Sequence, residues 1–167
     1  MKIFFRIYFK FQKIVNLEKY KQLKKKLKFC GEGVFFDGSC HFIVPEQLEI
    51  GNNSSISSYT TIYATYGITI GKNCLISSNC GISSVNHIQN ATNRRLYDND
   101  NSPYSKNVRI GDNVWIGMNA CILPGVSIGN NSIIGSGSVV TKSVPPNEVW
   151  VGNPARFIKR LDLLFES

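Results

Sequence analysis

The chain has 167 residues, which is enough for a single domain with a sizeable hydrophobic core. Its net charge of +8 is concentrated in one segment, because residues 1–29 carry a net charge of +9 and the other 138 residues carry −1. A near-neutral body behind one basic segment argues against a fold built to bind nucleic acid.

Residues 1–29 begin with MKIFFRIYFKFQKIVNL, where a charged residue interrupts the apolar residues every three or four positions. Neither a cleavable signal peptide nor an uncharged apolar run as long as a membrane span is visible. We expect a basic amphipathic helix, or a pair of helices, that caps the end of the following domain. Contact with an anionic inner membrane surface is an alternative role, because four of the first nine residues are aromatic.

Residues 30–151 show a repeat of six residues in which an isoleucine is often followed by glycine. An amphipathic helix would show a period of 3.6 and a strand a period of 2. A parallel β-helix fits, because three short strands and three tight corners use about 18 residues per coil and point one aliphatic side chain per side to the axis. The expected inward residues are Ile50, Ile56, Ile62, Ile70, Ile76, Ile82, Ile110, Ile116, Ile122, Ile128, Ile134 and Val140, with Phe36, Phe42 and Leu48 in an irregular first coil.

The corners repeat as well. An asparagine recurs three residues after the inward isoleucine, where a corner requires left-handed backbone angles, at Asn53, Asn73, Asn79, Asn113, Asn119 and Asn131. The next residue is small or slim and should point into the narrow interior: Ser54, Thr60, Cys74, Cys80, Val114, Ala120, Val126, Ser132 and Ser138. Cys74 and Cys80 are therefore interpreted as core residues. The five cysteines lack CxxC spacing, so we expect free thiols and a cytoplasmic protein.

Two segments leave the repeat. Residues 89–107 are polar, rich in asparagine and without period, and a long irregular loop in a regular solenoid is usually functional. After Val140 the repeat ends at Pro145 and Pro146. Residues 152–167 are predicted to form a tail with a short helix that covers this end of the β-helix.

The stretch VWIGMNACILPGVSIGNNSIIGSGSVVTKSVPPNEVWVGNPARFIK, residues 114–159, resembles the hexapeptide-repeat acyltransferases. Within them it is most similar to the branch of galactoside, maltose and polysaccharide O-acetyltransferases, and the likeness extends over about residues 48–160. The resemblance implies an all-β fold with a left-handed parallel β-helix, a homotrimer, and transfer from acetyl-CoA in clefts between subunits, without a metal.

Acyl transfer to a sugar hydroxyl needs a base, because the hydroxyl is a poor nucleophile near neutral pH. The chain has two histidines, His41 and His87, and His87 directly precedes the irregular loop in the motif VNH. The resemblance implies that His87 is the catalytic base, whereas His41 is interpreted as a surface or corner residue. Asp98 or Asp100, or a backbone carbonyl, could orient the imidazole. The repeat places the side chain of Cys121 on the outside of the coil, and we expect an ordinary surface residue without a catalytic role.

The resemblance also implies the other site residues. The oxyanion would be held by the backbone N–H of Met118 or Asn119. Acetyl-CoA would contact Trp115, Met118 and Ser136 along the pantetheine, and Thr141, Lys142 and Arg156 near the nucleotide phosphates, with Lys159 a weaker candidate. Asn86, Tyr59 and Tyr63 are candidate acceptor contacts. Two positions that grip the sugar in galactoside enzymes correspond here to Ser57 and Thr65, so a simple galactoside is not the expected acceptor.

We therefore predict an enzyme that O-acetylates a sugar of a surface polysaccharide or its precursor. The alternatives are N-acetylation of an amino sugar or nucleotide sugar, and a non-catalytic binding or structural module. A zinc enzyme on this scaffold would use three histidines per metal, and the chain has two. A serine acetyltransferase is disfavoured because its large helical N-terminal domain is absent from the sequence.

Overall fold

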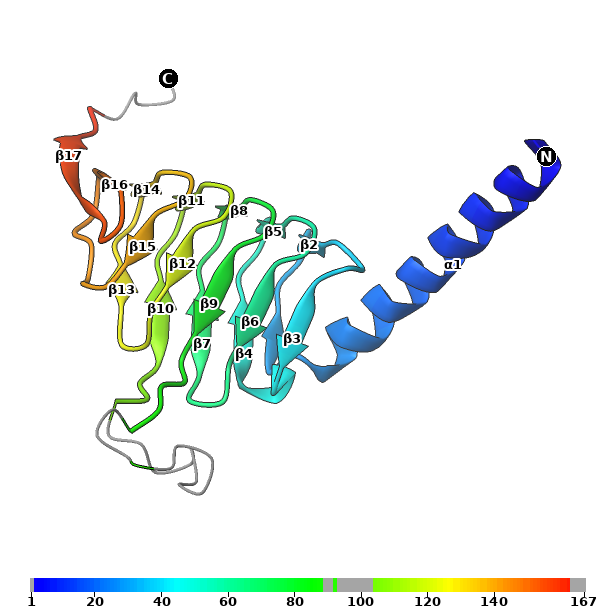
Figure 1. The fold of residues 1–167 in the computed structure, drawn as a ribbon, viewed down its shortest axis with the longest axis horizontal. Helices are drawn as coiled ribbons and strands as arrows, with labels where there is room; N and C mark the ends of the chain where they lie inside the picture. Colours follow the sequence, from blue (N-terminus) through cyan, green and yellow to red (C-terminus); the bar gives the residue numbers. More distant parts are fainter. Residues whose placement is uncertain (1, 89–91, 93–103, 163–167) are drawn as a thin grey trace.

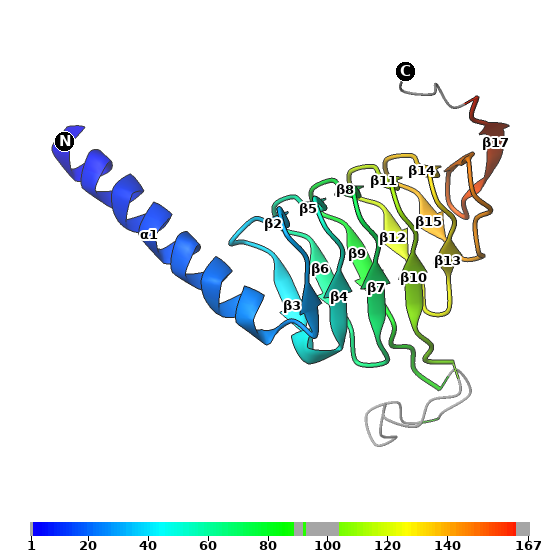
Figure 2. The same cartoon turned by 180° about the vertical axis from the view of Figure 1, so that it is seen from behind.

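The computed structural model describes residues 2–88, 92 and 104–162, and its short strands form the three sides of a parallel β-helix (Figures 1 and 2). Sheet A consists of β1 (Phe29–Cys30), β4 (Leu48–Ile50), β7 (Ile68–Ile70), β10 (Val108–Ile110) and β13 (Ser127–Ile128). Sheet B consists of β2 (Phe35–Phe36), β5 (Ser55–Ile56), β8 (Leu75–Ile76), β11 (Trp115–Ile116), β14 (Ile133–Ile134), β16 (Glu148–Val151) and β17 (Arg156–Arg160). Sheet C consists of β3 (His41–Ile43), β6 (Thr61–Tyr63), β9 (Gly81–Ser83), β12 (Cys121–Ile122) and β15 (Val139–Val140). A 3-10 turn, η1 (Pro45–Gln47), precedes β4.

The core is the stack of inward side chains along the axis. All the inward residues predicted from the six-residue period are buried, and so are Phe36, Phe42 and Leu48 of the first coil. Equivalent residues pair from coil to coil, as in the row Ile50, Ile70 and Ile110 of sheet A. Each such aliphatic residue contributes about 1.5–3 kcal/mol of burial free energy, so the stack stabilises every coil through its neighbours.

The corners also have the predicted geometry. The six predicted asparagines have positive φ, between 55° and 62°, and every predicted small residue is buried. Polar members of this set find partners inside: the Ser54 hydroxyl donates to the Gly71 carbonyl (2.7 Å) and the Thr60 hydroxyl to the Ser77 carbonyl (3.1 Å). Cys80 likewise points inward, with Sγ 3.2 Å from the Gly117 carbonyl oxygen. Cys74 and Cys80 are thus core residues.

The basic segment forms one helix, α1 (Lys2–Lys26), and only its C-terminal end packs on the β-helix. The Tyr20 hydroxyl donates to the Val34 carbonyl (2.8 Å), and the Tyr20 and Phe36 rings lie 4.7 Å apart. Leu23 and Leu27 complete this contact with the core. The rest of α1 projects away from the coils, so the expected cap is partial (Figures 1 and 2). In the described part of the chain, no helix combines the length and apolarity needed to cross a membrane.

The other end is closed by a strand, which corrects the expected C-terminal helix over residues 156–160. β17 pairs antiparallel with β16 and completes the open edge of sheet B, whose backbone groups would otherwise lack partners. The buried Glu148 joins the two strands: its carboxylate accepts hydrogen bonds from the Trp150 indole (2.8 Å) and the Arg160 guanidinium (3.2 Å). Residues 163–167 lie outside the described residues.

Candidate functional site

The predicted site residues lie on or beside the two corners that border sheet C. The B–C corner, which connects sheet B to sheet C, stacks Ser58, Ser78, Met118 and Ser136 in consecutive coils. Backbone hydrogen bonds fix this row: the N–H of Asn119 donates to the Ser78 carbonyl (3.1 Å), and that of Gly137 to the Met118 carbonyl (2.8 Å). The C–A corner, which leads out of sheet C toward sheet A, carries His87 in one coil and Thr141 and Lys142 in the last.

His87 follows β9, and the backbone before it is held in place by a residue that the sequence analysis missed. Ser105, buried at the return of the irregular loop, accepts the Asn86 backbone N–H (2.9 Å) and donates to the Asn86 carbonyl (3.1 Å). The Asn86 side chain in turn accepts the His87 backbone N–H (2.9 Å). The His87 side chain is exposed on this fixed support. Ser105 carries no sequence signal of its own, because its partner is 19 residues away.

Asp98 and Asp100, the carboxylates considered for orienting His87, lie outside the described residues. Most of the predicted loop 89–107 does as well. Its final residues rejoin the β-helix through Lys106, whose N–H donates to the Ser84 carbonyl (3.0 Å). The loop therefore leaves and re-enters at the C–A corner beside His87.

The pantetheine candidates lie together on sheet B and its B–C corner. Trp115 on β11 is half exposed, and its indole N–H approaches the Ser77 hydroxyl at 3.4 Å. Met118 and Ser136 are exposed on neighbouring coils. Between them the backbones approach closely, because a Cβ on Gly117 would lie 2.6 Å from the Ser136 nitrogen. Glycine at position 117 thus allows the close contact between these two coils.

The phosphate candidates are divided between the two corners. Arg156 begins β17 next to the B–C corner, where it is exposed and its guanidinium donates to the Ala155 carbonyl (2.9 Å). Thr141 and Lys142 are exposed at the C–A corner, after β15, and Lys159 is exposed on β17. One side of a coil, about five residues or about 16 Å of extended chain, separates the two corners. Within one chain, His87 and Met118 are therefore on opposite edges of sheet C.

The acceptor candidates Tyr59 and Tyr63 border sheet C at its two edges. Tyr59 is at the B–C corner, with positive φ (59°) and a largely exposed ring, and its N–H donates to the Ser39 hydroxyl (3.0 Å). Tyr63 ends β6 on the side of the C–A corner and is exposed. Tyr59 therefore extends the row of Met118 and Ser136 toward the N-terminal coils, whereas Tyr63 lies on the edge that carries His87.

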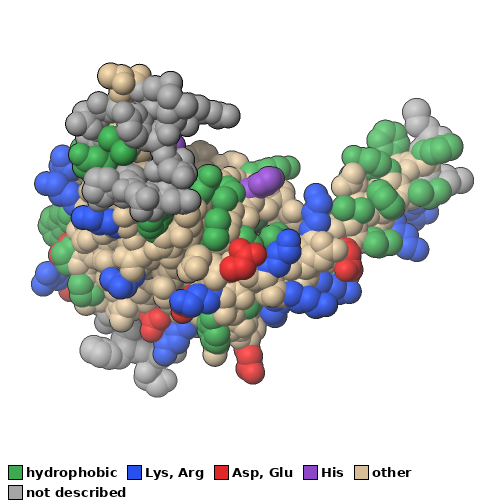
Figure 3. All heavy atoms as spheres, turned by 90° about the horizontal axis from the view of Figure 1, so that it is seen from below, with side chains coloured by type: hydrophobic (Ala, Val, Ile, Leu, Met, Phe, Trp, Pro, Cys, Tyr) green, Lys and Arg blue, Asp and Glu red, His purple; other side chains and the backbone are tan. Residues whose placement is uncertain are grey.

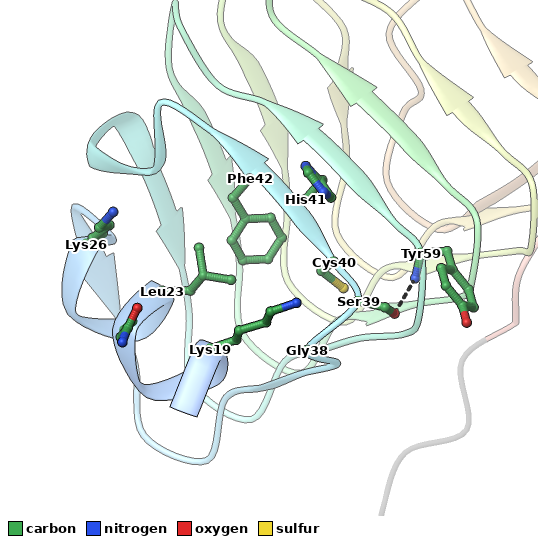
Figure 4. Close-up of a pocket in the computed structure, with 10 residues that line it drawn as sticks. Lys19, Leu23, Lys26, Gly38, Ser39, Cys40, His41, Phe42 and Tyr59 are labelled. Carbon is green, nitrogen blue, oxygen red and sulfur yellow. Dashed lines mark hydrogen bonds between the residues drawn. The ribbon is translucent and has the colours of Figure 1, made fainter. Parts of the chain in front are cut away.

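A cavity of about 570 Å³ opens between α1 and β3, at the N-terminal end of the B–C corner (Figure 4). Lys19 and Lys26 of α1 face it from one side, and His41, Ser39 and Tyr59 from the other. Its lining contains cationic and aromatic side chains and no carboxylate. The sequence analysis missed the two lysines, although their spacing of seven residues places them on one face of a helix.

The thiols are poorly suited to covalent catalysis. Burial raises the pKa of the Cys121 thiol, so little thiolate forms near neutral pH. Burial likewise raises the pKa of Cys40 to about 11. All five cysteines are free. Among the described residues, no group of three or more His, Cys, Asp or Glu side chains is arranged to hold a metal ion.

Comparison with known families places the repeat in a defined class. The family model described as "Bacterial transferase hexapeptide (six repeats)" matches residues 107–142. The model described as "Hexapeptide repeat of succinyl-transferase" matches residues 67–86. One match ends at Asn86, directly before His87, and the other includes Trp115 and Met118.

Individual proteins match over most of the chain. The galactoside O-acetyltransferase of Escherichia coli K12 is 37% identical over 148 residues, covering 88% of this chain and 71% of that protein. A hexapeptide-repeat acetyltransferase of Vibrio cholerae, solved with acetyl coenzyme A, has a TM-score of 0.79 and 27% identity, covering 87% of this chain and 78% of that one. A variant N-acyltransferase of Bacillus cereus, solved with dTDP and coenzyme A, has a TM-score of 0.65 and 25% identity, covering 86% and 89%.

Proposed function

Because this chain belongs to the hexapeptide-repeat acetyltransferases and is an acetyl-CoA-dependent acyltransferase, we propose that it acetylates a sugar hydroxyl of a surface polysaccharide or its precursor. The observation that carries this proposal is His87, an exposed imidazole on a backbone held by Ser105 and Asn86 at the mouth of the irregular loop. An exposed base on a fixed backbone suits general-base transfer to an acceptor that enters from solvent.

In the proposed mechanism His87 accepts the proton of the acceptor hydroxyl as the oxygen attacks the acetyl carbonyl. The backbone N–H of Met118 or Asn119 stabilises the oxyanion of the tetrahedral intermediate. The intermediate then releases coenzyme A as a thiolate, and the His87 imidazolium returns its proton to that sulfur. The raised pKa of Cys121 favours this direct route over an acyl-cysteine intermediate.

The separation of the two corners supports a site formed between chains. His87 at the C–A corner and Met118 at the B–C corner cannot reach a single acetyl group within one chain. They can do so when the C–A corner of one subunit faces the B–C corner of the next. Repeating this unlike contact around a three-fold axis closes a ring, so we propose a homotrimer with three sites at its interfaces.

The order of residues along the B–C corner supports binding of the acceptor on the side of Met118 that faces α1. Ser136 lies on the C-terminal side of Met118 in this row, and Tyr59 lies two coils on its N-terminal side, about 10 Å away at the usual strand spacing. We propose that acetyl-CoA extends toward β17 and the acceptor toward α1. The cavity lined by Lys19, Lys26 and His41 would then hold an anionic group of the acceptor, such as a phosphate or carboxylate.

The first test measures thiol release from acetyl-CoA over a panel of neutral and anionic sugars, nucleotide sugars and oligosaccharides. We expect His87→Ala to lower kcat about a hundred- to ten-thousandfold, whereas Cys121→Ser keeps the activity of the unchanged enzyme. Full turnover in His87→Ala would remove the base assignment. Turnover with amino sugars and not with hydroxyl acceptors would instead establish N-acetylation, which the likeness to an N-acyltransferase keeps as the second candidate.

The second test concerns the cavity. We expect Lys19→Gln combined with Lys26→Gln to raise KM severalfold for an anionic acceptor and to leave KM for acetyl-CoA unchanged. Lys21→Gln is the matched control, because Lys21 pairs with Glu18 on the helix surface and does not line the cavity. Equal effects of the double variant and of Lys21→Gln, or a change in KM for acetyl-CoA, would exclude the cavity from acceptor binding.

A further inference from the structure

The outer part of α1, residues 4–15, carries a row of exposed apolar side chains. Seven of them are more than half exposed: Phe4, Phe5, Ile7, Tyr8, Phe9, Phe11 and Ile14. Their ring contacts are with one another, as between Phe5 and Phe9 (6.5 Å) and between Tyr8 and Phe9 (5.8 Å). In the space-filling view these side chains cover the projecting end of the helix, with basic side chains along one edge (Figure 3). A concentration of this size on a solvent-facing element indicates a surface for a partner.

The sequence of α1 places most of this apolar face on a different side from the residues that pack on the β-helix. Residues seven apart lie on nearly the same line of a helix. The line of Arg6, Lys13 and Tyr20 is charged in the outer part and becomes apolar where the helix packs on Phe36. The line on the opposite side is apolar in the outer part and charged in the inner part: Phe4, Phe11, Glu18 and Lys25. The part of the apolar face centred on Phe4 and Phe11 therefore points away from the side on which Tyr20 packs, and Phe5 extends the face round to the line of Leu23.

The width of this face and the charges beside it indicate which kind of partner it binds. Phe5 and Ile14 are nine residues apart, which places them half a turn from each other around the axis, so apolar side chains cover about half of the helix surface. The seam of a helix-to-helix contact is narrower than this. The remaining side carries Arg6, Lys10 and Lys13, which share one face. A broad aromatic face beside a cationic stripe is the pattern of a helix that lies in the surface of an anionic membrane.

We propose that residues 4–15 dock α1 on an anionic lipid bilayer, with the apolar face in the acyl boundary and the cationic stripe at the headgroups. In this orientation the β-helix stays on the aqueous side, because Tyr20 packs on it from the side of α1 opposite Phe4 and Phe11. The three basic residues of the last helical turn, Lys24, Lys25 and Lys26, add positive charge near the membrane surface. The cavity between α1 and β3 then lies close to the membrane.

The test is flotation of the full chain with vesicles of phosphatidylcholine alone or with about one third phosphatidylglycerol. We expect binding to the anionic vesicles that weakens with salt, and little binding to the neutral ones. Phe4→Glu with Phe11→Glu should abolish binding, and Arg6→Gln with Lys13→Gln should weaken it about thirtyfold. Phe157→Glu is the control and should bind as the unchanged chain does, because Phe157 is also more than half exposed but lies on β17.

Two measurements make the result decisive. Thermal unfolding of each variant shows that the β-helix is intact, and the mass of the assembly in vesicle-free solution tests a second copy as the partner. The proposal is wrong if the unchanged chain does not float with anionic vesicles, or if all variants bind alike. Loss of assembly mass in Phe4→Glu with Phe11→Glu, without vesicle binding by the unchanged chain, would assign the face to contacts between copies.

Discussion

Tyr59 has a backbone conformation that a bulky side chain rarely adopts. Its φ of 59° equals that of Asn79 and Asn119, which hold the same corner position in the following two described coils. Asparagine tolerates left-handed angles, whereas tyrosine is strained there by about 1–3 kcal/mol. Tyr59 lines the cavity and is 69% exposed, so burial offsets little of this strain. Strain of this kind at a cavity supports a role for the ring in acceptor binding.

The strain predicts an inverse relation between stability and binding. We expect Tyr59→Asn to raise the free energy of unfolding by about 1 kcal/mol, measured by urea denaturation, because asparagine relaxes the corner. The same variant should have a higher KM for the acceptor. The reciprocal change Asn79→Tyr should lower stability by a similar amount. A less stable Tyr59→Asn would mean that ring contacts outweigh the strain.

At the level of elements, the corners that follow sheet A are linked by an asparagine ladder. The side-chain amide of Asn113 donates to Asn131 (3.0 Å), and that of Asn131 donates to Asn147 (2.8 Å). All three residues have positive φ. The asparagines therefore serve twice, once by accepting the left-handed angle and once by joining consecutive coils through their side chains.

Substitutions at Asn131 can separate these two contributions. Asn131→Gly keeps the left-handed angle and loses two side-chain hydrogen bonds, for an expected cost of about 1–2 kcal/mol. Asn131→Ala also imposes the strained angle on a residue with Cβ, for about 2–4 kcal/mol in total. Chemical denaturation of both variants measures the difference. Equal costs would show that the ladder, and not the backbone angle, determines the corner.

Element by element, prediction succeeded where the signal is local. Ile116 and Asn119 could be placed inside and at a corner because a period of six repeats within a few residues. β17 could not be predicted, because its pairing depends on the unfilled edge of β16 and on the contact between Arg160 and Glu148. The partial packing of α1 is also a matter of tertiary structure, although the change of apolar side along the helix was present in the sequence.

For the whole molecule, the central feature is the division of the site residues between two corners. The choice of His87 as the base stays a prediction from its place before the loop and from the family resemblance, whereas its support by Ser105 depends on how the loop returns to the coil. Met118 and Ser136 were identified through family resemblance. That they lie on the opposite edge of sheet C from His87 follows only from the assembled coils, and this separation is the reason that we propose a site between two chains.

A site shared between chains predicts complementation. We expect His87→Ala and Ser136→Trp to be inactive alone, the first without a base and the second with a blocked pantetheine surface. After an equimolar mixture is unfolded and refolded together, about a quarter of the interfaces should combine two intact halves and recover activity. Thiol release from acetyl-CoA measures the recovery. Mixed assemblies without activity would place both residues in a site within one chain.

The regular stacking of coils also fixes the distances between equivalent residues along the axis of the β-helix. Each turn advances the chain by one strand spacing, about 4.8 Å, so Met118 and Ser136 are one spacing apart, and β16 and the antiparallel β17 fix the two further spacings to Arg156. A flexible loop could adapt to donors of different length, but a rigid stack holds the two ends of a linear donor at a set separation. In the orientation that we propose for acetyl-CoA, the number of turns between Met118 and β17 sets the length of donor that fits, and insertion or deletion of one turn would change that length by one strand spacing.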